Sequence, residues 1–170
     1  MKIFSHALAV LLLLSTYACN DSESPLLSDD SFESFEISYS DKKYVINHQD
    51  DLHTYIKSIV DEPILGIIRA EFTHLPSENG TFPAIRAVYS LADEMVTMVL
   101  PLEIKHSPGV IARADGAPSY TVGCRMECKA APDCAAGCDQ TIYEACKRQS
   151  CSCKTPTEFN SGCDAVTIFF

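Results

Sequence analysis

The sequence predicts an α+β fold: a small antiparallel sheet with one amphipathic helix, followed by a short disulfide-rich, partly helical C-terminal module and a terminal strand. Residues 50–60 place apolar side chains at helical spacing, and the flanking segments alternate apolar and polar residues or are β-branched. Eight of the nine cysteines lie between positions 124 and 163. Such a cluster in an exported chain indicates a module that is cross-linked by sulfur.

The N-terminus has the pattern of a secretory signal peptide over residues 1–18. A single Lys2 precedes an unbroken apolar run at 7–14, and the small residues Ser15 and Ala18 follow. A bilayer-spanning helix needs about 20 apolar residues, so this run is too short to cross a membrane. We therefore expect the chain to be exported and cleaved at the end of this segment.

Thr16-Tyr17-Ala18-Cys19 resembles the lipobox of bacterial lipoprotein precursors, in which a small residue precedes a cysteine that becomes acylated and N-terminal. Ala18 and Cys19 match that pattern, whereas Thr16 and Tyr17 depart from its aliphatic and small positions. The resemblance covers residues 1–19 only, and it implies that lipidated Cys19 anchors the chain to a membrane. Ordinary cleavage after Ala18, without a lipid, is the alternative.

The number of cysteines supports the same interpretation independently. Nine is an odd count, and an odd thiol in an exported protein needs an explanation. If Cys19 carries lipid, the other eight cysteines can all pair. Asn20 stands where some such lipoproteins carry an aspartate that retains them in the inner membrane. The resemblance therefore implies the outer membrane, on its periplasmic or surface side.

Residues 19–36 are expected to be a lipid-anchored, acidic, flexible tether. The stretch from 20 to 36 contains six acidic residues and no basic one, and self-repelling sequence with few apolar groups stays extended and solvated. Its expected reach is roughly 20–25 Å. The six acidic residues are Asp21, Glu23, Asp29, Asp30, Glu33 and Glu36.

Residues 37–123 are expected to form the α+β core. Apolar residues alternate from Phe35 to Tyr39 and resume at Tyr44 after a polar link, which predicts a hairpin. The helix at 50–60 is expected to be capped by Asn47. Further strands are predicted at 64–73, 84–91 and 95–104, with loops at 74–82 and 105–118 and an optional short strand at 110–112.

Residues 124–170 are expected to form a cysteine-rich module with a terminal strand at 165–170, in one folding unit with the core. Few large apolar side chains occur between 124 and 163, so burial alone cannot offset an ordering entropy of roughly 1–2 kcal/mol per residue. Disulfides, each contributing about 2–4 kcal/mol, are expected to supply the difference. The candidates are Cys124, Cys128, Cys134, Cys138, Cys146, Cys151, Cys153 and Cys163.

The spacing of Cys134, Cys138 and Cys146 places them on one face of a predicted helix that begins after Asp133. Cysteines four apart on a helix are too distant to bond, so each is expected to reach a second segment. One arrangement pairs Cys128 with Cys134 and Cys124 with Cys138, leaving the other four to pair among themselves. Eight cysteines allow 105 connectivities, so the alternatives stay open.

No cofactor and no resident metal are expected. Zinc and iron–sulfur sites usually use C-x2-C pairs, which this chain lacks. Cys151 and Cys153, separated by one residue, nevertheless make a soft-metal thiolate protein the rival interpretation. A redox-active cysteine pair is a further alternative.

The sequence contains none of the nucleophile, phosphate-loop or zinc-protease motifs that we sought, so no catalytic residue is assigned and an enzyme is not expected. The net charge of −10 excludes a nucleic-acid partner and leaves room for a cationic protein partner. The expected function is therefore that of a cell-envelope lipoprotein that acts by binding or as structure. Inhibition of a cationic, envelope-attacking enzyme is an additional alternative.

Overall fold

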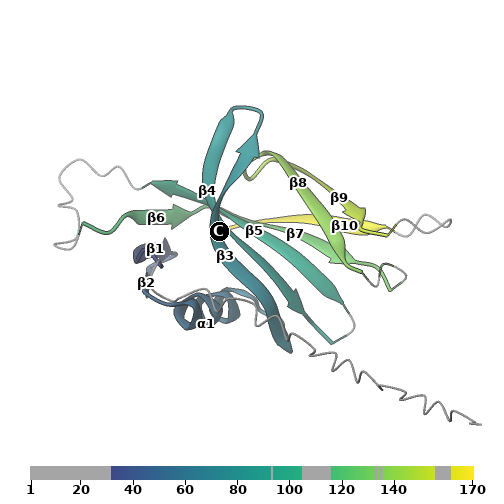
Figure 1. The fold of residues 1–170 in the computed structure, drawn as a ribbon, viewed down its shortest axis with the longest axis horizontal. Helices are drawn as coiled ribbons and strands as arrows, with labels where there is room; N and C mark the ends of the chain where they lie inside the picture. The colour runs from purple at the N-terminus through teal and green to yellow at the C-terminus, as the bar shows by residue number, and fades with distance from the viewer. Residues whose placement is uncertain (1–31, 93, 105–115, 133, 135, 156–161) are drawn as a thin grey trace, which may run out of the picture.

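The structure, a computed structural model, describes residues 32–92, 94–104, 116–132, 134, 136–155 and 162–170. Of the described residues, 62% lie in strands and 9% in a single helix. The predicted α+β class is therefore wrong. The protein is mostly β, with a mixed eight-stranded sheet and a separate two-stranded hairpin (Figure 1). The predicted signal peptide, Cys19 and most of the tether lie outside the described residues.

The predicted first hairpin, the helix and the strand at 95–104 are present, and the terminal strand pairs with the sheet. In chain order, the elements of the described residues are β1 (Phe35–Tyr39), β2 (Lys42–Ile46), α1 (Gln49–Ile59), β3 (Gly66–Ser77), β4 (Gly80–Ser90), β5 (Met95–Ile104), β6 (Ser119–Val122), β7 (Cys124–Ala130), β8 (Cys138–Glu144), β9 (Arg148–Cys153) and β10 (Cys163–Phe169).

Strand β5 is the centre of the sheet. One edge pairs with β4, and the other pairs with both β7 and β6. Val99 lies opposite Met126 and Leu102 lies opposite Val122, so the register shifts by one residue at Gly123 and β6 continues into β7. The two halves of this long strand therefore offer one shared outer edge to further strands.

The first and last strands occupy that edge end to end. β1 pairs with β6 in parallel and β10 pairs with β7 in antiparallel fashion. The Phe170 N–H donates to the Gly123 carbonyl at 3.2 Å, and the Tyr39 and Phe170 rings meet edge to face with centroids 4.6 Å apart. The parallel β1–β6 pair makes the sheet mixed, where the sequence had predicted an antiparallel one.

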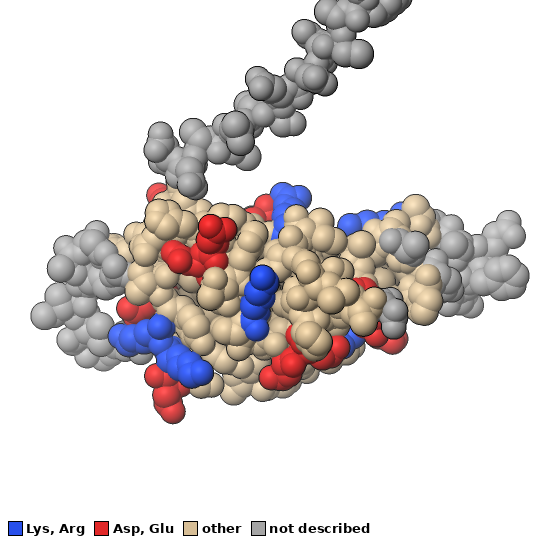
Figure 2. All heavy atoms as spheres, turned by 90° about the horizontal axis from the view of Figure 1, so that it is seen from below, with Lys and Arg blue, Asp and Glu red and all other residues tan. Residues whose placement is uncertain are grey.

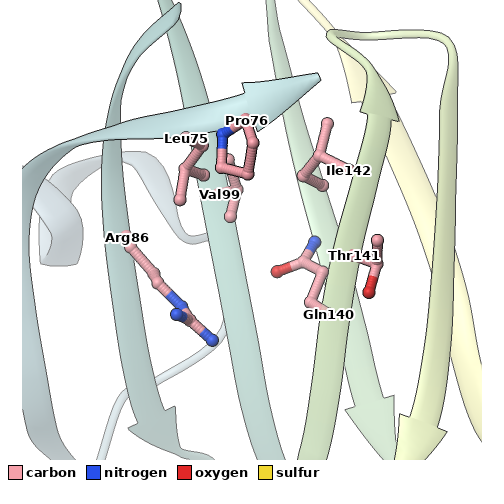
Figure 3. Close-up of a pocket in the computed structure, with 7 residues that line it drawn as sticks. All are labelled: Leu75, Pro76, Arg86, Val99, Gln140, Thr141 and Ile142. Carbon is pink, nitrogen blue, oxygen red and sulfur yellow. The ribbon is translucent and has the colours of Figure 1, made fainter. Parts of the chain in front are cut away.

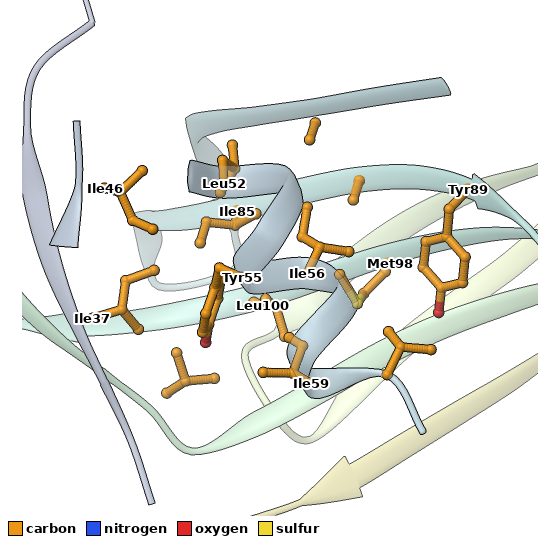
Figure 4. Packing of buried hydrophobic residues seen from close by; sticks show 14 of the residues in the cluster. Ile37, Ile46, Leu52, Tyr55, Ile56, Ile59, Ile85, Tyr89, Met98 and Leu100 are labelled. Atoms are coloured by element: carbon orange, nitrogen blue, oxygen red, sulfur yellow. The ribbon is translucent and has the colours of Figure 1, made fainter. Parts of the chain in front are cut away.

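Helix α1 covers one face of the sheet. Leu52, Tyr55, Ile56 and Ile59 are buried on its inner side, against alternate residues of β4 and β5 (Figure 4). Because side chains alternate across a strand, every second residue of β5 reaches this core. This interface contains most of the buried apolar side chains of the described residues and is the main hydrophobic core. Burial of each aliphatic side chain contributes about 1.5–3 kcal/mol to its stability.

The start of α1 differs in detail from the prediction. The N-cap is His48, not Asn47. The Asp51 carboxylate accepts hydrogen bonds from the backbone N–H groups of Asn47 and His48, at 2.9 Å and 3.1 Å. An acid in the first turn thus satisfies donors that the helix itself leaves without partners.

A buried polar network joins the end of α1 to the sheet. Arg125 and Glu127, on the helix-facing side of β7, are 6% and 2% exposed. Arg125 Nη1 donates to the Ile59 carbonyl at the end of α1, and its Nε lies 2.8 Å from Glu127 Oε1 in an ion pair that is not a linear hydrogen bond. The Tyr89 hydroxyl donates to Glu127 Oε1 at 2.9 Å. These side chains fix the helix on the sheet.

The β8–β9 hairpin covers the opposite face of the sheet. The Thr97 hydroxyl of β5 donates to the Cys138 carbonyl at 3.0 Å, and Gln140 Nε2 donates to the Met126 carbonyl at 3.0 Å. At the far end, the Glu78 N–H donates to the Tyr143 carbonyl at 3.0 Å. The protein is thus layered as helix, sheet and hairpin.

The helix predicted after Asp133 is wrong, because the segment from 138 to 144 is strand β8. Cys138 and Ile142 are buried while Asp139, Thr141 and Tyr143 are exposed, which is a period of two. Gly137, with φ of 80°, also interrupts any helix through the segment. A spacing of four residues places two cysteines on the same face of a strand, as it does on a helix.

The loop predicted at 74–82 is also wrong. β3 continues to Ser77 and β4 begins at Gly80, so the two strands turn over Glu78 and Asn79. Pro76 is tolerated because β3 pairs only with β4 and is an edge strand, where a missing N–H costs no ladder bond. The pairing of β3 with β4 is irregular between Ile67 and Arg69, where the register shifts.

Candidate functional site

All eight predicted cysteines are paired, but not as the sequence suggested. The predicted bonds Cys128–Cys134 and Cys124–Cys138 are absent from these pairs, and the other four cysteines do not pair among themselves. The bonds are Cys124–Cys146, Cys128–Cys151, Cys134–Cys153 and Cys138–Cys163. Three of them tie β7 or the segment after it to the hairpin, and the fourth ties the hairpin to β10.

Two of these disulfides lie side by side at the open end of the hairpin. Cys134 Sγ is 3.6 Å from Cys163 Sγ, which is 3.9 Å from Cys153 Sγ. The sulfur atoms of Cys134, Cys138 and Cys163 all lie within 4.8 Å of one another. We call Cys134, Cys138, Cys153 and Cys163 the sulfur cluster. Cys134 and Cys138 are buried, and the other two are half-buried.

A cavity of about 230 Å³ lies where β8 crosses over the sheet. Leu75, Pro76, Val99 and Ile142 form its apolar wall, and Arg86 and Gln140 supply polar groups (Figure 3). β3, β4, β5 and β8 each contribute a side chain, so the disulfide-anchored hairpin is needed to form the cavity. It follows that the cysteine module shapes this site without placing a sulfur in it.

Arg86 is the cation of this cavity. It is half-buried on the hairpin-facing side of β4, and within the described part of the chain it makes no hydrogen bond or ion pair. Its cross-strand neighbour Glu71 bonds instead to Arg69, at 2.6 Å. A guanidinium carries five donors that match a carboxylate or phosphate, so Arg86 is available for an anionic ligand.

Gln140 faces Arg86 from the opposite wall (Figure 3). Its Nε2 donates to the Met126 carbonyl at 3.0 Å and to Gln149 Oε1 at 2.7 Å, which fixes the orientation of the amide. The Oε1 atom is buried and has no hydrogen-bond partner among the residues that the structure describes. An acceptor without a partner costs free energy on burial, so a ligand N–H or O–H would be stabilised here.

Arg86 also lines a second cavity, of about 260 Å³. Arg69 and Lys154 line it together with the apolar side chains of Ile68, Val88 and Met95. Arg86 lines both cavities, and the two share its positive charge. We call the two cavities together the Arg86 groove.

The opposite side of the molecule looks different. Figure 2 views the protein from the side on which α1 lies in Figure 1, and there acidic and basic side chains of the described residues are interspersed with uncharged surface. The groove, by contrast, gathers three basic side chains around an apolar floor. The groove is therefore the stronger candidate for a binding site.

No family model, no curated protein and no solved structure matches this chain. The site must be interpreted from its own chemistry. Among the described residues, no helix is long and apolar enough to cross a membrane. The predicted lipid anchor, Cys19, lies outside the described residues.

Sequence reasoning did not identify Arg86 or Gln140 as site residues. One signal was present: Arg86 is the single charged residue between Glu78 and Asp93, within an otherwise apolar strand. Gln140 carries no such signal, because the sequence pattern predicts a helix there and does not show which residues form the opposite wall of the cavity. The predicted cysteines were found correctly as a disulfide set.

Proposed function

We propose that this chain is a non-catalytic binding protein of the cell envelope, anchored through lipidated Cys19, that holds the carboxylate end of a ligand in the Arg86 groove. The observation that carries the proposal is the half-buried Arg86 facing Gln140 Oε1, neither of which has a hydrogen-bond partner among the described residues. A cationic side chain and a hydrogen-bond acceptor in the wall of one cavity favour binding of a ligand over a purely structural role.

The chemistry of the walls defines the ligand class. Arg86 suits a carboxylate, Gln140 Oε1 suits a neighbouring N–H, and the wall of Leu75, Val99 and Ile142 suits an apolar side chain. The last residue of a peptide carries these three groups on one carbon atom. The cavity is smaller than the pockets of roughly 300–1,000 Å³ that hold drug-sized ligands, which fits a single residue.

The disulfides support the proposed compartment. A module held by four disulfides is stable in oxidising, extracytoplasmic space and rare in the cytosol. Because the groove offers basic groups, we propose an anionic ligand for it. The net charge of the whole chain left room for a cationic protein partner, but the basic side chains of this groove do not suit a cation.

The test is a calorimetric titration of the purified, oxidised chain with N-acetyl-glycyl-leucine and with the same peptide as its C-terminal amide. We expect the acid to bind and the amide to bind at least about tenfold more weakly, since a bond to a charged group contributes about 1.5–3 kcal/mol. Arg86→Met should abolish this preference while keeping the apolar stem. Lys57→Met, on the exposed side of α1, removes the same charge and should bind like the wild type.

Three results would contradict the proposal: no binding of either peptide, equal binding of acid and amide, or unchanged binding by Arg86→Met. Thermal unfolding of each variant checks that the fold is intact. Because Arg86 makes no internal hydrogen bond or ion pair among the described residues, its replacement should leave the unfolding temperature nearly unchanged.

A further inference from the structure

The sulfur cluster brings four cysteines together from four places in the chain. Cys134 precedes β8, Cys138 begins β8, Cys153 ends β9 and Cys163 begins β10. Cys138 and Cys153 are directly opposite each other in the hairpin ladder. The disulfides Cys134–Cys153 and Cys138–Cys163 therefore lie next to each other, although forming either disulfide does not require the other to be near.

Two of the sulfur–sulfur distances between the disulfides are close to those of a metal site. In a tetrahedral tetrathiolate with zinc–sulfur bonds of about 2.3 Å, neighbouring sulfur atoms lie about 3.8 Å apart. Cys134 and Cys163 are separated by 3.6 Å, and Cys163 and Cys153 by 3.9 Å, although neither pair is bonded. Within the described residues, the sulfur atoms of Cys134, Cys138 and Cys163 also group within 4.8 Å.

We propose that, once these two disulfides are reduced, the sulfur cluster binds one soft divalent cation of the zinc or cadmium type as a tetrathiolate. Two equivalents of a dithiol supply four electrons and four protons, which convert two disulfides into four thiols. The cation then replaces four protons and forms four metal–sulfur bonds. Four thiolates favour such d¹⁰ cations over magnesium or calcium, which prefer oxygen ligands.

The rest of the fold can hold the site in this state. Cys124–Cys146 and Cys128–Cys151 attach the hairpin to β7 independently of the sulfur cluster. β10 is held beside β7 by a ladder from Cys163 to Phe169. Opening the two clustered disulfides therefore leaves Cys138, Cys153 and Cys163 on strands with another attachment, and Cys134 on the segment between β7 and β8.

This inference differs from the sequence-based rival, which centred on Cys151 and Cys153. Cys151 bonds to Cys128 and is not one of the four clustered cysteines. The inference is also independent of the proposed function, because none of the described cysteines lines either cavity of the Arg86 groove.

The experiment uses the full chain in its oxidised form and after limited treatment with a phosphine reductant, which offers no competing thiol, stopped when mass spectrometry of labelled thiols shows that two disulfides are open. Cobalt(II) and then zinc are added, and native mass spectrometry counts the bound ions. We expect no stoichiometric metal on the oxidised chain and one ion per reduced chain. Cobalt should give the visible absorption of a tetrahedral thiolate site, and about four protons should be released on zinc binding.

Two matched variants locate the site. Cys134→Ser with Cys163→Ser removes one sulfur from each clustered disulfide and should eliminate the bound ion. Cys124→Ser with Cys146→Ser removes the same number of sulfurs elsewhere and should retain it. If the reduced chain unfolds, zinc should restore its β-strand circular dichroism in the control variant but not in the cluster variant.

The proposal is overturned if the reduced chain neither binds an ion nor refolds with zinc. It is also overturned if the cluster variant still binds, or if both variants lose the ion equally. A disulfide map that joins the same four cysteines in another pairing leaves the proposal intact, because reduction produces the same four thiolates.

Discussion

At the scale of single residues, two tyrosines of the same buried cluster differ in whether their hydroxyl groups make a hydrogen bond. Tyr55 of α1 and Tyr89 of β4 are 0% and 1% exposed. The Tyr89 hydroxyl donates to Glu127 at 2.9 Å, whereas the Tyr55 hydroxyl has no partner within the described part of the chain. The same chemical change at the two positions should therefore have different effects on stability.

We expect Tyr89→Phe to lower the free energy of unfolding by about 1.5–3 kcal/mol, because it removes a hydrogen bond to a carboxylate that stays buried. Tyr55→Phe removes a hydroxyl that gains nothing on burial, so it should leave the unfolding free energy unchanged or raise it by up to about 1 kcal/mol. Urea unfolding of the oxidised protein measures both. Equal losses for the two variants would show that the Tyr89–Glu127 contact contributes nothing specific.

Alkaline pH provides a second readout of the same pair. Burial raises the pKa of both hydroxyls, and the Glu127 charge raises that of Tyr89 further. In the unfolded chain a tyrosine has a pKa of about 10, so above that pH the unfolded state loses protons that the folded state keeps. The unfolding free energy of the wild type should thus fall as pH rises above about 10. The unfolding free energy of each phenylalanine variant should fall less steeply over the same range.

At the scale of elements, the disulfides act as attachments between the hairpin and the sheet. Cys128–Cys151 joins β7 to β9 across a sequence separation of 23 residues. In the loop-entropy view, closing a loop of this length stabilises the fold by about 3 kcal/mol. The double variant Cys128→Ala with Cys151→Ala should lose about that amount in urea unfolding and should show no free thiol.

A thiol count of the same variant controls for rearrangement. If Cys128 and Cys151 are partners, replacing both leaves six paired cysteines. Replacing Cys128 alone should expose one reactive thiol, which labelling and peptide mass mapping should assign to Cys151. A label on Cys134, the partner suggested by the sequence, would contradict the structure's connectivity.

The same elements show what sequence patterns could predict. The first hairpin and α1 followed from local periodicity, and the pairing of the cysteines as a class followed from the few large apolar side chains between 124 and 163 and from the signal-peptide pattern. Strand β8 could not be predicted in this way. Cys134, Cys138 and Ile142 are spaced four residues apart, and residues with this spacing share one face both in a helix and in a strand. Strand partners decided the outcome, since Cys138 lies opposite Cys153 in the hairpin ladder.

The candidate groove could not be predicted for a related reason. Arg86 and Gln140 are 54 positions apart and meet only because the disulfides lay β8 over β4 and β5. The unusual charge at Arg86 within an apolar strand was visible in the sequence, but its lack of an ion-pair partner was not. That property depends on Glu71 bonding to Arg69, and it emerges only from the register of β3 and β4.

At the scale of the whole molecule, the chain closes on itself at Gly123, where the ends of β1 and β10 meet. The described fold begins shortly before β1, whose first residues lie beside the start of β6, where the Glu36 N–H donates to the Pro118 carbonyl. A tether and anchor at the N-terminus would therefore attach at the end of β1 that is remote from β10. The Arg86 groove lies on the hairpin face. Its ligand would approach from outside the helix–sheet core.

The proposed anchor gives the last prediction. Two or more acyl chains on Cys19, at about 0.8 kcal/mol per buried methylene, hold a protein stably on a membrane. In a bacterium that processes lipoproteins, the wild type should fractionate with membranes and incorporate labelled fatty acid. Cys19→Ala should appear in the soluble exported fraction without label, and both proteins should contain no free thiol.

The thiol count separates this outcome from its rival. If cleavage follows Ala18 without acylation, the wild type is soluble, carries no fatty acid and retains one reactive thiol at Cys19, because the other eight cysteines are paired. Cys19→Ala would then remove that thiol and change nothing else. The parity of nine cysteines thus makes a simple chemical titration decide between a lipid-anchored protein and a freely diffusing one.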